Sequence, residues 1–151
     1  MSFEAETFQV ATEQSLPVAL VRAFCEVESA FNPWAVRYEP GYRWLVGNEV
    51  DLTATERTMQ MTSWGLMQVM GAVAREHGFT GPIPQLCDPI IGLRYGCLHL
   101  NKLHARYVLW PDTIAAYNAG TPRMVQGQYV NQTYVDRVDA AWKRNDATAE
   151  L

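Results

Sequence analysis

One carboxylic acid of the chain, Glu28, is followed by two polar segments whose side chains could act together with it. Residues 63–68 read Ser-Trp-Gly-Leu-Met-Gln, and residues 116–120 read Ala-Tyr-Asn-Ala-Gly. An acid of this kind can protonate the leaving oxygen of a glycosidic bond, with amide and phenol groups to hold the acid and the sugar. It must remain protonated near neutral pH, which apolar surroundings achieve by disfavouring the carboxylate. The three segments together predict cleavage of a sugar–sugar bond.

Each segment also has a purely structural explanation. A glutamate late in a helix, such as Glu28, is usually a solvated surface residue. Gln68 lies in an apolar run, where its amide could bind an N-acetyl group or a sugar hydroxyl, or could simply point to water or tie down a loop. Asn118 and Gly120 are typical helix-terminating residues, and Tyr117 could belong to the core. In the functional interpretation, the Tyr117 hydroxyl and the Asn118 amide face the acid.

The hydrophobic pattern predicts helices over most of the chain. The first begins near Ser15, runs to about Ala30, and places Glu28 at the edge of its apolar stripe. The other predicted helices cover 53–62 with Thr53 and Glu56 as a capping pair, 70–77 closed by Gly78, 88–107 opened by Asp88, 111–120, a short one from Thr121, and a last one capped by Asn131. Strand signals are weak throughout, so we expect a mainly α fold.

The other segments bear on the domain organisation. Residues 1–14 are polar, and we expect them to form a loose N-terminal lead-in. Residues 33–52 are rich in Pro, Gly, Tyr and Trp and predict an irregular loop, which at this length inside a compact domain is often functional. No repeat, low-complexity tract or linker interrupts the chain. We therefore predict a single domain over residues 1–151, with its core over about 16–142.

Composition and charge argue against several classes of protein. Apolar residues make up 48% of the 151-residue chain and charged residues 19%, which is typical of a globular protein and not of a disordered one. The net charge is −4 and no basic block occurs, so we expect no nucleic-acid partner and no general attraction to an acidic polymer. Seven Tyr and five Trp suit either a core or the walls of a sugar groove.

The N-terminus and the three cysteines bear on where the protein works and what it binds. The first residues carry neither a positive start nor an apolar stretch, and no apolar run approaches the roughly 20 residues of a membrane span. We therefore expect synthesis in the cytoplasm without a signal peptide and no stable membrane insertion. Separately, we expect a monomer. Cys25, Cys87 and Cys97 follow no metal-ligand spacing, so we expect no metal site at the cysteines. We interpret them as three buried thiols, with a Cys87–Cys97 disulfide as the alternative.

Five short motifs, in this order, resemble the catalytic domain of soluble lytic transglycosylases, the glycoside hydrolase family 23 group that also includes goose-type lysozymes. The motifs are Glu-Ser-x-Phe-Asn-Pro at 28–33, Ser-x-Gly-Leu-Met-Gln-Val-Met at 63–70, the Asp-Pro-opened helix from Asp88 through Gly92 and Tyr95, Ala-Tyr-Asn-Ala-Gly at 116–120, and Tyr-Val-x-x-Val at 134–138. The resemblance covers about residues 16–142. It implies a lysozyme-like, multi-helix domain with a sugar-binding cleft.

The chain departs from the family pattern between Glu28 and Gly65, a step that compact members make in far fewer residues. The additional residues resemble the insertion found in phage-type members, and they change the expected shape of the cleft but not the identity of the acid. A phage protein would fit the absence of a signal peptide, whether it is an endolysin or a virion component that opens the wall during infection. A domain taken from a longer bacterial protein would fit it as well.

The resemblance also implies a mechanism. The family cleaves the β-1,4 bond between N-acetylmuramic acid and N-acetylglucosamine in peptidoglycan and leaves a 1,6-anhydro product, so no water is consumed. By this resemblance, Glu28 would act first as acid and then as base, with assistance from the muramic N-acetyl group in place of a second carboxylate. The implied reaction needs no metal and no cofactor. The residues that the resemblance places at the substrate are Ser63, Gln68, Met70, Tyr117, Asn118 and Tyr134.

Two other functions remain open at this point. Glu39, Glu49 and Asp51 lie in or beside the long loop, and one of them, with Glu39 as the candidate, could be a second carboxylate that activates water. A carboxyl separation of roughly 6.5–9.5 Å would fit such a lysozyme-like hydrolase. Otherwise these acids pair with neighbouring arginines (Arg37, Arg43 or Arg57) or stay solvated. A non-catalytic glycan-binding or structural virion module is the third possibility, against which the intact Glu28 argues.

Overall fold

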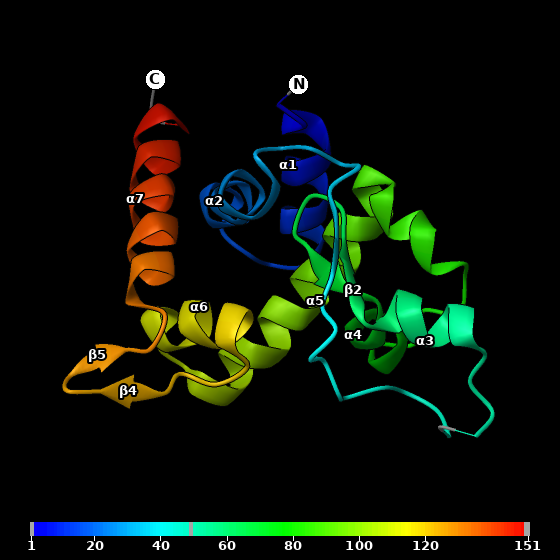
Figure 1. The fold of residues 1–151 in the computed structure, drawn as a ribbon. Helices are drawn as coiled ribbons and strands as arrows, with labels where there is room; N and C mark the ends of the chain where they lie inside the picture. The colour runs from blue at the N-terminus through cyan, green and yellow to red at the C-terminus, as the bar shows by residue number, and fades with distance from the viewer. Residues whose placement is uncertain (1, 49, 150–151) are drawn as a thin grey trace.

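The computed structural model describes residues 2–48 and 50–149, and across them the fold is mainly helical, as the sequence predicts (Figure 1). The helices are α1 (Glu4–Glu13), α2 (Val18–Ser29), α3 (Ala54–Gln60), α4 (Gly71–Glu76), the 3-10 helix η1 (Ile83–Cys87), α5 (Pro89–Tyr107), α6 (Trp110–Ala119) and α7 (Gln132–Ala149). The strands are β1 (Val36–Tyr38), β2 (Thr62–Trp64), β3 (Val69–Met70), β4 (Met124–Val125) and β5 (Gln128–Tyr129).

Helix α2 is the centre of the packing. It lies between α7 and α1, while α5 packs against both α1 and α6 (Figure 1). Phe24 and Leu20 of α2 are fully buried, and so are Leu93 and Leu100 of α5. Burial of each such side chain contributes roughly 1.5–3 kcal/mol to folding. The catalytic candidate Glu28 is therefore carried by one of the most firmly packed elements of the domain.

Local capping signals position two of the helices as predicted. The Thr53 Oγ1 accepts a hydrogen bond from the backbone N–H of Glu56 at 3.1 Å and begins α3. The Asp88 carboxylate accepts one from Ile91 N at 3.0 Å and begins α5. Ser15, in contrast, is not the cap of α2, which begins at Val18 after Pro17 without any side-chain capping bond.

Two predicted elements are wrong. Residues 4–13 are not a loose lead-in but helix α1, which packs against α5 and α2. Its buried stripe consists of Thr7, Val10 and Ala11, of which Val10 alone is a larger apolar residue, so the hydrophobic signal in the sequence is weak. The short helix expected from Thr121 is instead the hairpin β4–β5. Its turn, Gln126-Gly127, has both residues at positive φ, as a two-residue type I′ hairpin turn requires.

The long segment after α2 is held by a small sheet and by one buried amide. Strand β1 pairs antiparallel with β2, and β2 pairs with β3. Farther along, the side chain of Gln60, which is 1% exposed, accepts a hydrogen bond from Val46 N at 2.7 Å and donates one to Val46 O at 2.9 Å. The segment is irregular, as predicted, but it is tied to the body of the domain at β1 and at Val46.

Cys25, Cys87 and Cys97 are all buried and free, which confirms the interpretation as thiols. Among the helices of the described residues, none combines the length and the apolar character needed to cross a membrane.

Candidate active site

Glu28 lies in the last turn of α2, half-buried, with its carboxyl group against helix α7. Its Oε1 accepts a short hydrogen bond from the hydroxyl of Tyr134. The chain leaves the helix sharply just after it, because Ala30 and Phe31 both have positive φ, at 50° and 58°. Two successive non-glycine residues in this region are uncommon, and such backbone strain occurs preferentially at functional sites.

Burial raises the pKa of Glu28 to about 7, from an ordinary value of 4.5. The hydrogen bond from Tyr134 and the positive charges of Arg37 and Arg137 act in the opposite direction and lower the pKa. Burial outweighs them because removing a carboxylate from water disfavours its charged form strongly. The pKa of Tyr134 is raised well above its ordinary value by its own burial and by Glu28, so the phenol keeps its proton and remains the donor. Near neutral pH, Glu28 is thus present in both its protonated and its ionised form.

The turn at residues 65–68 is held beside the end of α2 by contacts to its backbone. Gly65 has a φ of 73°, and a Cβ at this position would lie 2.4 Å from the carbonyl oxygen of Leu86, so only glycine fits. The Ser29 hydroxyl donates to Leu66 O at 2.8 Å, and the Tyr117 hydroxyl donates to Met67 O at 2.8 Å. One turn of backbone is therefore held by α2 on one side and by α6 on the other.

Gln68 holds the same turn from within. Its Nε2 donates to Ala35 O and to Gly65 O, both at 3.0 Å, and its Oε1 accepts from the Ser63 hydroxyl at 3.0 Å. Both amide hydrogens are used in these bonds. Of the two interpretations of Gln68 made from the sequence, the hydrogen bonds favour the one in which it ties down a loop.

The expectation that the Tyr117 hydroxyl and the Asn118 amide face Glu28 is wrong, because both groups bond to other partners. The Tyr117 hydroxyl does not bond to Glu28, since it donates to Met67 O; its ring packs against Phe24, with centroids 4.6 Å apart. Asn118 is exposed, and its Oδ1 accepts a hydrogen bond from Asn131 Nδ2 at 3.0 Å. The residue that holds the acid is Tyr134, which the sequence placed only at the substrate.

The acids of the long loop do not form an evident second catalytic group. Glu39 pairs with Arg37, with 2.9 Å between Oε1 and Nε, which is one of the alternatives named from the sequence. Asp51 is exposed. Glu49 lies outside the described residues. Met70 is half-buried on β3, directly opposite Ser63 of β2.

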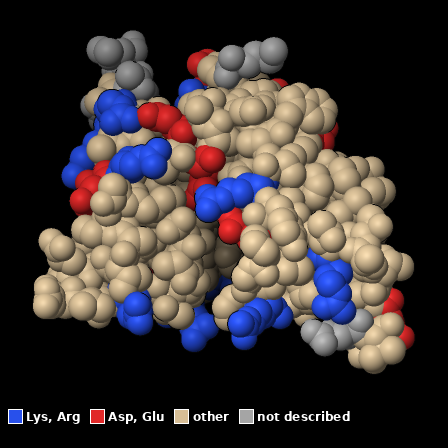
Figure 2. Space-filling model, viewed as in Figure 1, with Lys and Arg blue, Asp and Glu red and all other residues tan. Residues whose placement is uncertain are grey.

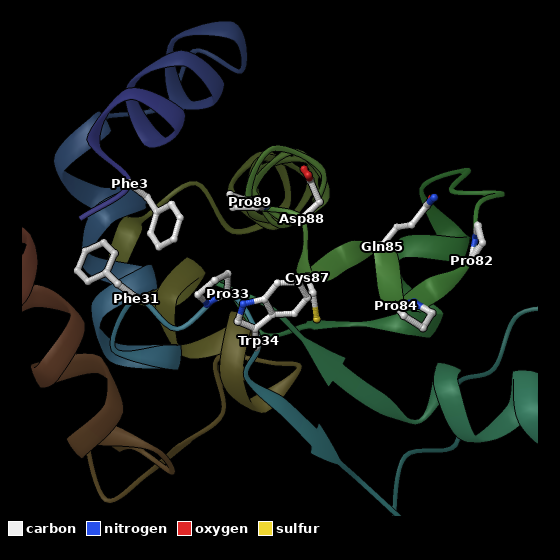
Figure 3. Close-up of a pocket in the computed structure, with 10 residues that line it drawn as sticks. All are labelled: Phe3, Phe31, Pro33, Trp34, Pro82, Pro84, Gln85, Cys87, Asp88 and Pro89. Atoms are coloured by element: carbon white, nitrogen blue, oxygen red, sulfur yellow. The ribbon is translucent and has the colours of Figure 1, made fainter. Parts of the chain in front are cut away.

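The surface of the described residues is hollowed in several places, two of which bear on the site. Figure 2 shows one between α6 and the segment that carries β1, with basic and acidic side chains gathered above it. A second hollow, a pocket of about 700 Å³, contains none of the site residues predicted from the sequence. Figure 3 shows its mostly apolar lining, which comprises Phe3, Phe31, Pro33, Trp34, Pro82, Pro84, Gln85, Cys87, Asp88 and Pro89.

With this geometry established, comparisons with known proteins decide the family. The model of the transglycosylase SLT domain matches residues 6–136. The chain belongs to this family. The SLT domain begins inside α1, in agreement with the packing of that helix and not with a loose lead-in.

A solved structure supports the same fold. The SLT domain is similar to the lytic transglycosylase Slt from Pseudomonas aeruginosa, solved as an inactive Glu-to-Gln mutant, with a TM-score of 0.70 and 21% identity. The match covers 99% of this chain and 25% of that chain, so the SLT domain spans about a quarter of the length of that enzyme. The curated proteins contain no significant match. The lysozyme-like, lytic transglycosylase fold expected from the motifs is confirmed.

Three residues near Glu28 were not identified as site residues from the sequence. Ser29 follows the acid directly, and its bond to Leu66 O links two of the motifs. Arg137 lies three residues after Tyr134, a helical spacing that could have indicated it once Tyr134 was placed at the acid. Arg37 gave no signal, because strand β1 was not predicted and only the strand shows which way its side chains point.

Proposed function

We propose that this SLT domain is a peptidoglycan lytic transglycosylase that cleaves the β-1,4 bond between N-acetylmuramic acid and N-acetylglucosamine, with Glu28 as its acid and base. The observation that carries the proposal is the half-buried carboxyl group of Glu28, whose pKa is raised by burial to about 7. A group with this pKa can both give and accept a proton at neutral pH. The Pseudomonas enzyme with a similar fold is described as inactive when a Glu is replaced by Gln, which agrees with an essential carboxyl group.

The proposed reaction has two steps. In the first, protonated Glu28 transfers its proton to the glycosidic oxygen as the bond to the anomeric carbon breaks, and the muramic N-acetyl oxygen stabilises that carbon. In the second, the Glu28 carboxylate takes the proton of the muramic 6-hydroxyl, whose oxygen bonds to the anomeric carbon and displaces the N-acetyl oxygen. The acid is regenerated and no water is consumed, so the product ends in a 1,6-anhydro ring.

Tyr134 would orient this carboxyl group. Its hydroxyl donates to Oε1 of Glu28, and among the described residues no other side chain bonds to that carboxyl group. A hydrogen bond to one oxygen favours the proton on the other, Oε2, which would then be the atom that faces the glycosidic oxygen. We further propose that Ser63, Met70 and Asn118 border the saccharide sites, with Gln68 and Tyr117 shaping the turn beneath them.

Hydrolysis through Glu39 is the second candidate. The Arg37–Glu39 ion pair disfavours it, because Oε1 of Glu39 already lies 2.9 Å from the Arg37 guanidinium instead of being free to hold a water molecule. A purely glycan-binding module is disfavoured by the burial of Glu28, since a binder gains nothing from a carboxyl group held near neutrality. The length of the segment between Glu28 and Gly65 supports assignment to the phage-type members, which act on the bacterial cell wall.

Digestion of purified cell walls, followed by mass spectrometry of the released muropeptides, tests the proposal. Anhydro ends are expected. Reducing ends, one water heavier, would overturn it in favour of the hydrolase, and an absence of products would favour the binder. Glu28→Gln should abolish release while the variant remains folded, and near-normal activity of this variant would mean that the acid is assigned wrongly.

A further inference from the structure

Two arginines lie close enough to Glu28 for their charges to act on its carboxyl group, and they come from elements far apart in the sequence. Arg37 lies on β1, in the long segment that distinguishes this chain from compact relatives, and Arg137 lies on α7. Among the residues that the structure describes, they are the charged side chains that act on Glu28. The other groups that it influences, Tyr134, Tyr117 and Cys25, are neutral at physiological pH because burial raises the pKa of each.

The sheet register places Arg37 on the face where sugar contacts are proposed. Arg37 is directly opposite Ser63, and Ser63 is opposite Met70 on the third strand. Residues paired in this way project from the same face of a sheet. The neighbours of Arg37 on β1, Val36 and Tyr38, are exposed on the other face.

The helical spacing places Arg137 beside the same carboxyl group. Tyr134 holds Glu28 directly, and Arg137 follows one turn later on α7, where side chains three residues apart share a face. Arg137 is exposed and makes no hydrogen bond or ion pair with any residue in the described part of the chain. Its guanidinium is therefore available to a ligand.

An ion pair orients the Arg37 guanidinium without using all of its hydrogen-bond donors. Its Nε is 2.9 Å from Glu39, and its side chain is 74% exposed. A guanidinium has five N–H donors, and an ion pair through Nε fixes its plane while the two Nη atoms remain available to a second carboxylate. In the described residues no partner bonds to those two atoms.

The positive charges of Arg37 and Arg137 act against proton donation by Glu28 in the free enzyme. Positive charge beside a general acid favours its ionised form, and a proton donor is not improved by it. Two arginines at this position are explained if the substrate itself brings negative charge that compensates them. Binding would then remove their effect on Glu28 at the moment when its proton is needed.

We propose that Arg37 and Arg137 form a carboxylate-binding site beside Glu28, which recognises an acidic substituent on the muramic sugar. This inference rests on the proposed function, because it assumes that the saccharide lies along the Ser63–Met70 face. The carboxylate could be the lactyl group of a peptide-free muramic acid or a carboxylate of the attached peptide. Either one offers the two oxygens that a guanidinium binds side by side. An uncharged N-acetylglucosamine polymer would lack this contact.

Binding measurements in the Glu28→Gln background separate recognition from turnover. The ligands are peptide-bearing glycan strands, strands freed of peptide by an amidase, and strands whose carboxylates have been converted to neutral methylamides. We expect the added pair Arg37→Gln and Arg137→Gln to weaken binding of carboxylate-bearing strands roughly tenfold or more. Binding of the methylamide strands should be unchanged, and this also shows that the variant is folded. Arg43→Gln, in the same long segment, is the matched control and should leave all affinities unchanged.

The outcomes are distinct. A loss confined to peptide-bearing strands identifies the peptide carboxylate, and a loss confined to peptide-free strands identifies the lactyl group. Equal affinities with and without the two arginines, or an equal loss for charged and neutralised strands, would overturn the carboxylate site while leaving the transglycosylase proposal in place. If the parent Glu28→Gln protein bound none of the strands, both proposals would be wrong.

Discussion

Replacing Glu28 by Gln should stabilise the protein at alkaline pH while it removes activity. The folded protein holds the pKa of this carboxyl group at about 7, whereas an unfolded chain has the ordinary value of 4.5. The folded state therefore binds this proton more tightly, and the resulting stability is complete below pH 4.5 and is lost as the pH rises to about 7. The full difference corresponds to roughly 3 kcal/mol, and the partial exposure of the group reduces it to about 2 kcal/mol.

Urea denaturation of the two proteins measures this effect. At about pH 4, below the ordinary pKa of 4.5, the free energy of unfolding should be nearly the same for the wild type and Glu28→Gln, and at about pH 8 the variant should be more stable by about 2 kcal/mol. Glu26→Gln is the control, since Glu26 lies on the same helix in a surface ion pair with Arg144 and should contribute less than about 1 kcal/mol at either pH. A Glu28→Gln protein that is no more stable than the wild type at pH 8 would refute the argument that burial raises the pKa.

Three further predictions concern other residues of the domain. Tyr134→Phe should raise the pKa of Glu28 by about 1 and move the alkaline limb of the pH–rate profile upward by a similar amount, whereas an unchanged limb would mean that the hydrogen bond does not tune the acid. Burial lowers the pKa of His99 to about 4 from 6.5, so its contribution to stability is present above pH 6.5 and is lost as the pH falls toward 4. In urea denaturation across that pH range, His99→Gln should reduce the loss of unfolding free energy at acid pH by roughly 2 kcal/mol. An unaltered pH dependence of the variant's stability would count against this prediction. Gly65→Ala should destabilise the domain by roughly 2 kcal/mol or more. The control Gly78→Ala should cost about 1 kcal/mol, because Gly78 has a similar φ but open space around it. Equal losses of the two variants in thermal unfolding would contradict the close approach of Gly65 to the Leu86 carbonyl.

Short-range signals explain what could be predicted of the fold. The caps at Thr53 and Asp88 act over three residues, so their sequence patterns are sufficient to begin α3 and α5. Helix α1 was missed because its buried stripe contains a threonine and an alanine, and its stability comes from packing against α5 and α2. The β4–β5 hairpin was missed because its turn depends on Gln126 and Gly127 adopting positive φ, which Gln rarely does.

In the site, too, short motifs could be recognised in the sequence, whereas contacts between distant residues could not. Motifs pointed to Glu28 as the candidate acid, but its hydrogen-bond partner Tyr134 is separated from it by 106 residues and is determined by the packing of α7 against α2. Tyr117 and Tyr134 carry the same phenol, and nothing local to either residue indicates which one reaches the carboxyl group. The position of Arg37 depends on the β1–β2 register, which only the folded sheet defines.

The central claim is that burial holds the proton of Glu28 near neutrality, and a carbon-13 NMR titration of its side-chain carboxyl carbon tests this most directly. Comparison with Glu28→Gln identifies the resonance. We predict a titration midpoint at about pH 7. A midpoint at the ordinary value of 4.5 would contradict the account, because the group would then be ionised at neutral pH and could not serve as the proton donor.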